Sequence, residues 1–141
     1  HHRFLSLFYR SWADAQPTVS HDRPEKDVFA KRLSVFSGVD ESALAAPLAL
    51  LMQEHLAPKE IRPSARIPNI GLEQLSDVQF DRRSAMTQIP ALIKAYLRLG
   101  GCVGQGAYLD QAFNTTDVCL ILDTAQMTAR AAALYGVGAQ A

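Results

Sequence analysis

The stretch from residue 89 to residue 124 constrains the fold of this chain most strongly. Apolar residues recur at helical spacing over residues 86–99, glycines follow at once, and VCLIL at residues 118–122 is uninterrupted. The helical spacing predicts an amphipathic helix, and the uninterrupted run VCLIL predicts a strand that is covered on both faces. A further short strand is expected at residues 107–109. This order of elements is typical of an α/β unit.

The N-terminal part predicts two helices. The first spans residues 3–15 and ends before Pro17. Its apolar stripe consists of Phe4, Leu7, Phe8 and Trp12. The second begins at Asp22 and Glu25, which have the spacing of a capping box, and ends at Gly38.

A third helix is predicted over residues 42–56, either kinked at Pro47 or beginning at Ala46. The connector at residues 57–71 is expected to be extended, because its prolines exclude a regular helix and disfavour a central strand. These prolines are Pro58, Pro63 and Pro68. A last short helix is expected over residues 124–135.

Composition excludes several classes of protein. Fourteen Lys and Arg balance fourteen Asp and Glu, and this zero net charge argues against non-specific electrostatic binding of nucleic acid or anionic lipid. No apolar run approaches the ~20 residues that span a bilayer, and no signal-peptide pattern is present. Cys102 and Cys119 are interpreted as reduced, half-buried thiols of a cytoplasmic protein, with a disulfide as the alternative.

Motifs with known chemistry give little support for a site. In GGCVGQGA the glycines follow a helix, whereas a dinucleotide loop precedes one, so the segment is interpreted as a helix cap and tight turn. No cofactor and no metal site are predicted, and no catalytic residue is identified. Asp110, Asp117 and Asp123 flank the expected strands, either as partners of an acceptor amine or as turn and cap residues.

Three blocks from residue 55 onward resemble the C-terminal half of ornithine-lipid acyltransferases and the related hemolysin-like members of the GNAT superfamily. The blocks are HLAPKEIRP at 55–63, IPALIKAYLRLGG at 89–101 and FNTTDVCLILDTAQMTAR at 113–130. The resemblance implies transfer of a 3-hydroxyacyl group from acyl carrier protein to an amine such as ornithine. It also implies that Tyr96, Arg98, Asn114 and Asp117 bind substrate.

The chain departs from that superfamily at the turn that holds the donor, which has the pattern [QR]-x-x-G-x-[GA]. Arg98 and Gly101 come nearest to it, but Val103 occupies its last position. We therefore expect a partial acyltransferase that is inactive alone, with acyl carrier protein as a partner.

Residues 1–39 resemble TssG, a structural baseplate subunit of the type VI secretion system. The block RFLSLFYRSWADAQP, followed by DRP, carries this resemblance. It implies the alternative function, a structural or interaction component whose partners are other baseplate subunits. In that case the stripe of the first helix would dock on a partner, unless it packs on the second helix.

The two resemblances together predict an α+β chimera with a helical segment at residues 1–39 and an acyltransferase-like segment at residues 40–141. In such a chain VCLIL would lose the strands that normally flank it, leaving an aggregation-prone edge. Helices packed over this strand, or a homodimer formed through the unpaired edge, would then be required.

Overall fold

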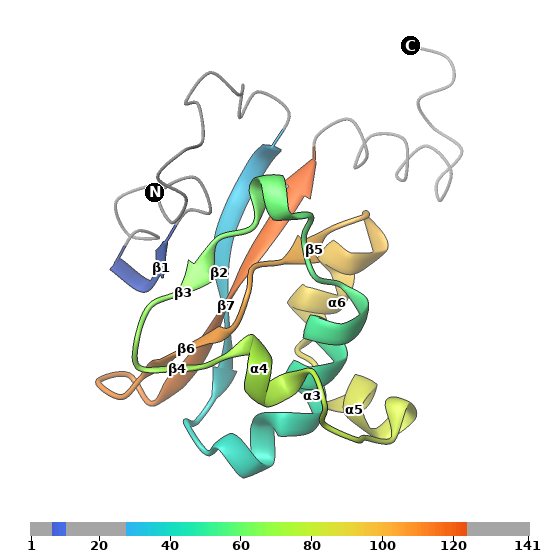
Figure 1. Ribbon diagram of the computed structural model, residues 1–141. Coiled ribbons are helices and arrows are strands. Elements are labelled where there is room, and N and C mark those ends of the chain that lie inside the picture. The colour runs from blue at the N-terminus through green and yellow to red at the C-terminus, as the bar shows by residue number, and fades with distance from the viewer. Residues whose placement is uncertain (1–6, 11–27, 124–141) are drawn as a thin grey trace.

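The computed structural model describes residues 7–10 and 28–123 and shows an α+β fold, as predicted (Figure 1). A five-stranded antiparallel sheet has the order β2-β7-β6-β4, with β5 also paired to β7, and β1 and β3 form a separate two-stranded sheet. The strands are β1 Tyr9–Arg10, β2 Val28–Ser37, β3 Ser64–Ala65, β4 Asn69–Ile70, β5 Cys102–Val103, β6 Ala107–Asp110 and β7 Thr115–Asp123. The helices are α3 Glu41–Glu54, η2 Lys59–Ile61, α4 Leu72–Leu75, α5 Arg82–Gln88 and α6 Ala91–Arg98.

Strand β7 lies at the centre of the large sheet. It pairs with β2 along one side, and with β6 and β5 along the other. Every side chain from Thr116 to Leu122 is at most 3% exposed. The buried strand predicted at residues 118–122 is confirmed, and so is β6. The prediction that VCLIL loses its neighbouring strands is wrong, because β7 is paired on both sides. A homodimer through an unpaired edge of this strand is therefore not required.

The flanking strand β2 occupies the place where the second helix was predicted, so that prediction is wrong. Exposure alternates along it: Ser34 and Phe36 are buried, whereas Val35 is 50% exposed. This period of two is that of a strand with one covered face. The apolar spacing fitted both structures, and pairing with β7 decides between them. Gly38, with φ of 85°, ends the strand, and its N–H donates to the carbonyl of Asn114.

The first predicted helix is wrong at Tyr9 and Arg10, which form β1, antiparallel to β3, whereas Leu7 and Phe8 just before them are helical. The Phe8 ring packs on that of Tyr108, with centroids 4.6 Å apart, and Leu7 is 64% exposed. Phe4 and Trp12 lie outside the described residues, as does the helix predicted at 124–135.

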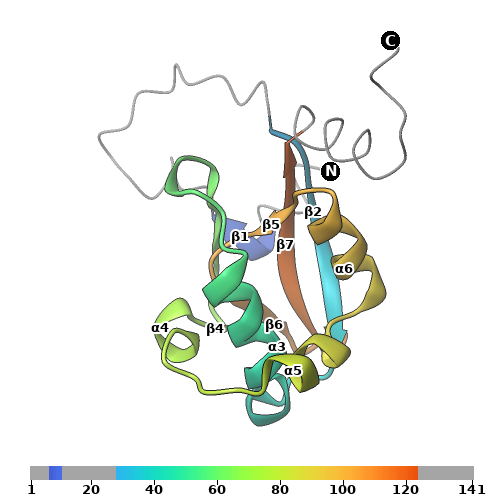
Figure 2. The same cartoon turned by 90° about the vertical axis from the view of Figure 1, so that its right-hand side faces the viewer.

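Helix α3 confirms the third predicted helix. Asp40 caps its N-terminus, where the side chain accepts a hydrogen bond from the N–H of Ser42. Pro47 lies inside the helix, so a start at Ala46 is wrong. The run from Leu48 to Met52 is buried on every face, since the helix lies between the sheet and the shorter helices α4 and α5 (Figure 2).

The helix predicted over residues 86–99 is divided into α5 and α6. Pro90 causes the break: Ile89 takes an extended conformation (φ −78°, ψ 128°), as the residue before a proline tends to do. Gly100, with φ of 88°, ends α6 as predicted. The proline-containing connector includes only short elements. At its start, the Ala57 N–H donates a hydrogen bond to the carbonyl of Val103 in β5.

Each face of the sheet has its own apolar cluster. Val118 and Leu120 point to the helices, whereas Cys119 and Ile121 point to the side of β1. Among the described ranges, none of the helices is both long and apolar enough to cross a bilayer.

Candidate functional site

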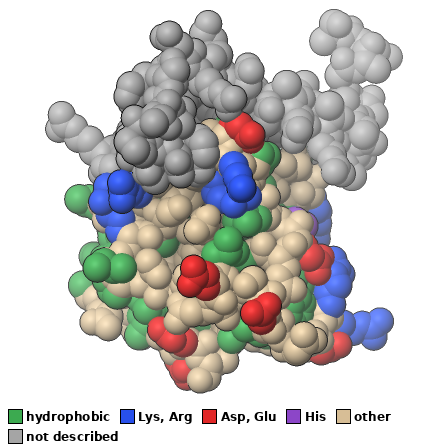
Figure 3. All heavy atoms as spheres, viewed as in Figure 1, with side chains coloured by type: hydrophobic (Ala, Val, Ile, Leu, Met, Phe, Trp, Pro, Cys, Tyr) green, Lys and Arg blue, Asp and Glu red, His purple; other side chains and the backbone are tan. Residues whose placement is uncertain are grey.

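A basic pocket lies among the ends of three helices on the covered face of the sheet. It has a volume of about 400 Å³ and is lined by His55, Arg82, Met86, Lys94, Leu97 and Arg98. This volume is within the range of small-molecule sites, which is roughly 300–1,000 Å³. Figure 3 shows Lys and Arg side chains with a histidine along the edge of the molecule where α3, α5 and α6 lie.

The local sequence positions each polar side chain of the basic pocket. His55 is the C-cap of α3, and Arg82 is the first residue of α5, after the N-cap Asp81. Lys94 and Arg98 are one turn apart on α6, so they project from the same side of that helix. The break at Pro90 separates α5 from α6 and so allows both helices to contribute cations to one opening.

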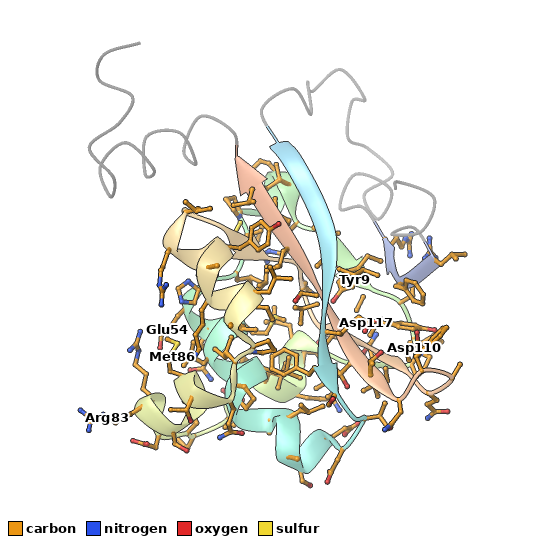
Figure 4. All side chains as sticks on the ribbon, turned by 180° about the vertical axis from the view of Figure 1, so that it is seen from behind. Tyr9, Glu54, Arg83, Met86, Asp110 and Asp117 are labelled. Atoms are coloured by element: carbon orange, nitrogen blue, oxygen red, sulfur yellow. The ribbon has the colours of Figure 1, made fainter. Side chains whose placement is uncertain are left out.

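A carboxylate partly neutralises the basic pocket. The Arg82 Nε lies 3.1 Å from each carboxylate oxygen of Glu54, and Figure 4 shows Glu54 beside Met86. Burial lowers the pKa of His55; the Glu54 charge opposes this shift and the Arg82 charge adds to it. The imidazole is therefore neutral at pH 7, and the pocket retains two more positive than negative charges.

A second cluster of ionisable groups lies on the opposite face of the sheet. The Tyr9 hydroxyl, on a side chain only 4% exposed, lies 2.8 Å from the carbonyl oxygens of both Gly106 and Asp117 (Figure 4). Burial raises the pKa of Tyr9 well above its ordinary value, so the hydroxyl keeps its one proton, which the two carbonyls share as acceptors. This contact anchors the N-terminal strand to the sheet.

The three aspartates near the strand ends differ in what surrounds them. Asp117 is buried and accepts a hydrogen bond from the Thr115 hydroxyl; burial, more than the nearby Asp110, raises its pKa. Asp110 accepts a hydrogen bond from the Phe113 N–H, which supports its interpretation as a turn residue. The side chain of Asp123 lies outside what the structure describes.

The four residues expected to bind substrate do not converge. Tyr96 and Arg98 lie on α6, whose end is beside Leu122, because Gly101 lies against that side chain. Asn114 (φ 53°) is in the turn before β7, and Asp117 is five residues from Leu122, about 17 Å along the strand. Of the four, Arg98 alone lines the basic pocket.

Sequence reasoning missed three of the residues that accompany Arg98 there. Lys94 carried a usable signal, since it precedes Arg98 by four positions on an expected helix. His55 falls near the end of the helix predicted over residues 42–56, with no spacing that marks it as a site residue. Arg82 lies in a region without clear periodicity.

The glycine-rich segment begins as a helix cap, as predicted, but Cys102–Val103 within it form the strand β5, which was not predicted. The amides of the segment take part in the fold. The N–H of Gly101 donates to the Tyr96 carbonyl, that of Gly104 to the Cys119 carbonyl, and that of Gln105 to the Pro63 carbonyl. A phosphate loop needs such amides directed at its ligand. The segment therefore does not form a phosphate cradle.

The two cysteines do not form a disulfide, which agrees with their interpretation as thiols. Burial raises the pKa of the Cys102 thiol, and the Arg62 charge opposes this shift. Cys119 is almost completely buried, which is more than the expected half.

Several curated proteins are similar to most of this chain. It is 48% identical to the L-ornithine N(alpha)-acyltransferase of Rhodobacter capsulatus over 100 residues, which are 71% of this chain and 38% of that protein. The proteins of the same name from Agrobacterium fabrum and Rhizobium meliloti are 39% and 46% identical over 72% and 74% of this chain. The chain spans little more than a third of the length of these relatives. No solved structure matches it.

A family model described as "Type VI secretion, TssG" matches residues 1–72. Any run of 100 residues in a chain of this length includes residues 42–100, so residues 42–72 fall within both similarities. Because the family model covers just over half of the 141 residues, the chain belongs to the type VI secretion TssG family, while most of its length is similar to L-ornithine N(alpha)-acyltransferases.

Proposed function

We propose that this chain is a partial N-acyltransferase, related to enzymes that move a 3-hydroxyacyl group from acyl carrier protein to an amine such as ornithine. The observation that carries the proposal is the 48% identity to an L-ornithine N(alpha)-acyltransferase over 71% of the chain. A reaction that uses acyl carrier protein also favours a cytoplasmic location. The division at residues 39 and 40 is part of the same proposal.

The residues proposed to bind substrate have different surroundings. Arg98 is the best supported, because it lines an open pocket. Asn114 is exposed in a turn, whereas Tyr96 packs partly against the apolar core and Asp117 is buried. In the reaction, an amine nitrogen attacks the thioester carbonyl, a C–N bond forms and the thiolate leaves. The amine proton must pass to a base, and we assign that role to no residue of this chain.

We expect the purified chain to show no acyl transfer on its own. It spans about a third of its relatives, and its glycine-rich amides already have partners within the fold. The test is incubation with 3-hydroxyacyl carrier protein and ornithine, followed by mass spectrometry of the product. The Rhodobacter capsulatus relative under the same conditions is the positive control. Robust transfer by this chain would show that the expectation is wrong.

The second candidate function is that of a structural component of a type VI secretion baseplate. Its specific support is the family model that matches residues 1–72. The test is co-purification of the tagged chain with the baseplate subunits of a complete secretion system. Retention of those subunits would support a structural role, whereas their loss at low salt, with the folded chain still on the column, would contradict it.

A further inference from the structure

We propose that the basic pocket is a binding site for a phosphate monoester with a short apolar substituent. The lining residues are those given above: His55, Arg82, Met86, Lys94, Leu97 and Arg98. This assignment rests on the charges and volume of the pocket and does not depend on the proposed acyl transfer.

The charge of the basic pocket suits a dianion. Three cationic side chains from two helices surround one opening, and Glu54 pairs with Arg82. Among the residues that the structure describes, neither Lys94 nor Arg98 has a carboxylate partner. The formal excess of two positive charges equals the charge of a phosphate monoester above its second pKa of about 6. A carboxylate would balance only half of this excess.

The two cations on α6 are placed at a cost to that helix. Lys94 and Arg98 are four positions apart, and like charges at this spacing destabilise a helix. A bound anion between them would remove this penalty. The C-terminal dipole accounts for Arg98 alone, but not for Lys94.

The size and lining of the basic pocket indicate that the ligand is larger than inorganic phosphate. About 400 Å³ is several times the volume of one phosphate group, and Met86 and Leu97 give part of the wall an apolar surface. The neutral imidazole of His55 can donate one N–H to a phosphate oxygen while leaving the cations to neutralise the charge. These features predict that a short alkyl chain on the phosphate strengthens binding.

The experiment is calorimetric titration of the full chain at low, constant ionic strength with inorganic phosphate, butyl phosphate and pentanoate. We expect butyl phosphate to bind more tightly than inorganic phosphate, and pentanoate to bind most weakly. Arg98→Gln and Lys94→Gln should each weaken butyl phosphate binding roughly tenfold or more, since a charge-assisted hydrogen bond is lost. Glu54→Gln should strengthen it up to about fivefold, because Arg82 is released from its exposed ion pair.

The matched control is Arg83→Gln. Arg83 is the exposed neighbour of Arg82, lies outside the pocket lining and points away from the body of the protein in Figure 4. Its replacement removes the same charge and should leave affinity unchanged. If Arg83→Gln and Arg98→Gln weaken butyl phosphate binding equally, the binding reflects general charge attraction, and the proposed site is wrong. Absence of butyl phosphate binding at millimolar concentration, or equally tight binding of pentanoate, would also overturn it.

Discussion

Tyr9→Ala is expected to lower the free energy of unfolding by about 3–5 kcal/mol, the usual effect of deleting a large buried aromatic side chain. The ring of Tyr9 is buried beside Cys119 and Ile121, and its hydroxyl contacts the carbonyls of Gly106 and Asp117. The substitution therefore leaves a cavity and two backbone acceptors without their donor. Such a loss is a large part of the 5–15 kcal/mol that stabilises an ordinary domain.

Urea denaturation followed by circular dichroism measures this effect. Tyr9→Phe keeps the ring and should cost only about 1 kcal/mol, since it removes the hydrogen bonds alone. Leu7→Ala is the matched control, because this neighbouring side chain is 64% exposed and its loss should change stability by less than about 0.5 kcal/mol. If Tyr9→Ala unfolds at the same urea concentration as Leu7→Ala, then β1 does not belong to the folded core.

Gly101→Ala is expected to destabilise the fold by about 1–3 kcal/mol through overpacking. A Cβ at this position would lie 2.7 Å from the Tyr96 carbonyl oxygen and 3.1 Å from its carbon. Both are backbone atoms at the end of α6 and cannot rotate away. The Gly101 N–H also donates to that same oxygen, so the strain reaches the helix terminus that carries Arg98.

The same denaturation experiment tests this prediction, with Gly71→Ala as the control. A Cβ at Gly71 would meet its nearest atoms at 3.6 Å, an ordinary contact. Gly71 is the N-cap of α4, where alanine is somewhat unfavourable, so the control should cost less than about 1 kcal/mol. Equal stability of the two variants would mean that the turn after α6 can open to accept a side chain.

The elements that the sequence predicted correctly have patterns in which length and apolar character agree. The run VCLIL has the length of a strand and is apolar throughout, as a covered strand requires, and α3 has a cap at Asp40 and a long apolar body. The segment that became β2 was ambiguous, since its apolar residues suit a helix as well as a strand. Only its pairing with β7, which is not visible in local sequence, decides between them.

The candidate site was less predictable than the fold. Arg98 was named from a family resemblance, and Lys94 could have been found from its spacing. Arg82 and His55 both precede the helix expected over residues 86–99, and they reach the same opening through the packing of α5 against α3. Pro90 separates α5 from α6, which carries Lys94 and Arg98. The position of that break was legible in the sequence, but the direction of α6 after it depends on packing against the sheet.

The antiparallel pairing of β2 with β7 has a consequence for synthesis of the protein. Of the residue pairs that join these two strands, Ser37 and Thr115 are the closest in sequence, and they are 78 positions apart. At a translation rate of about 5–20 residues per second, β2 leaves the ribosome roughly 4–16 s before its partner. During this interval both of its edges are open to other nascent chains, so chaperones that shield extended segments should influence the yield of folded protein.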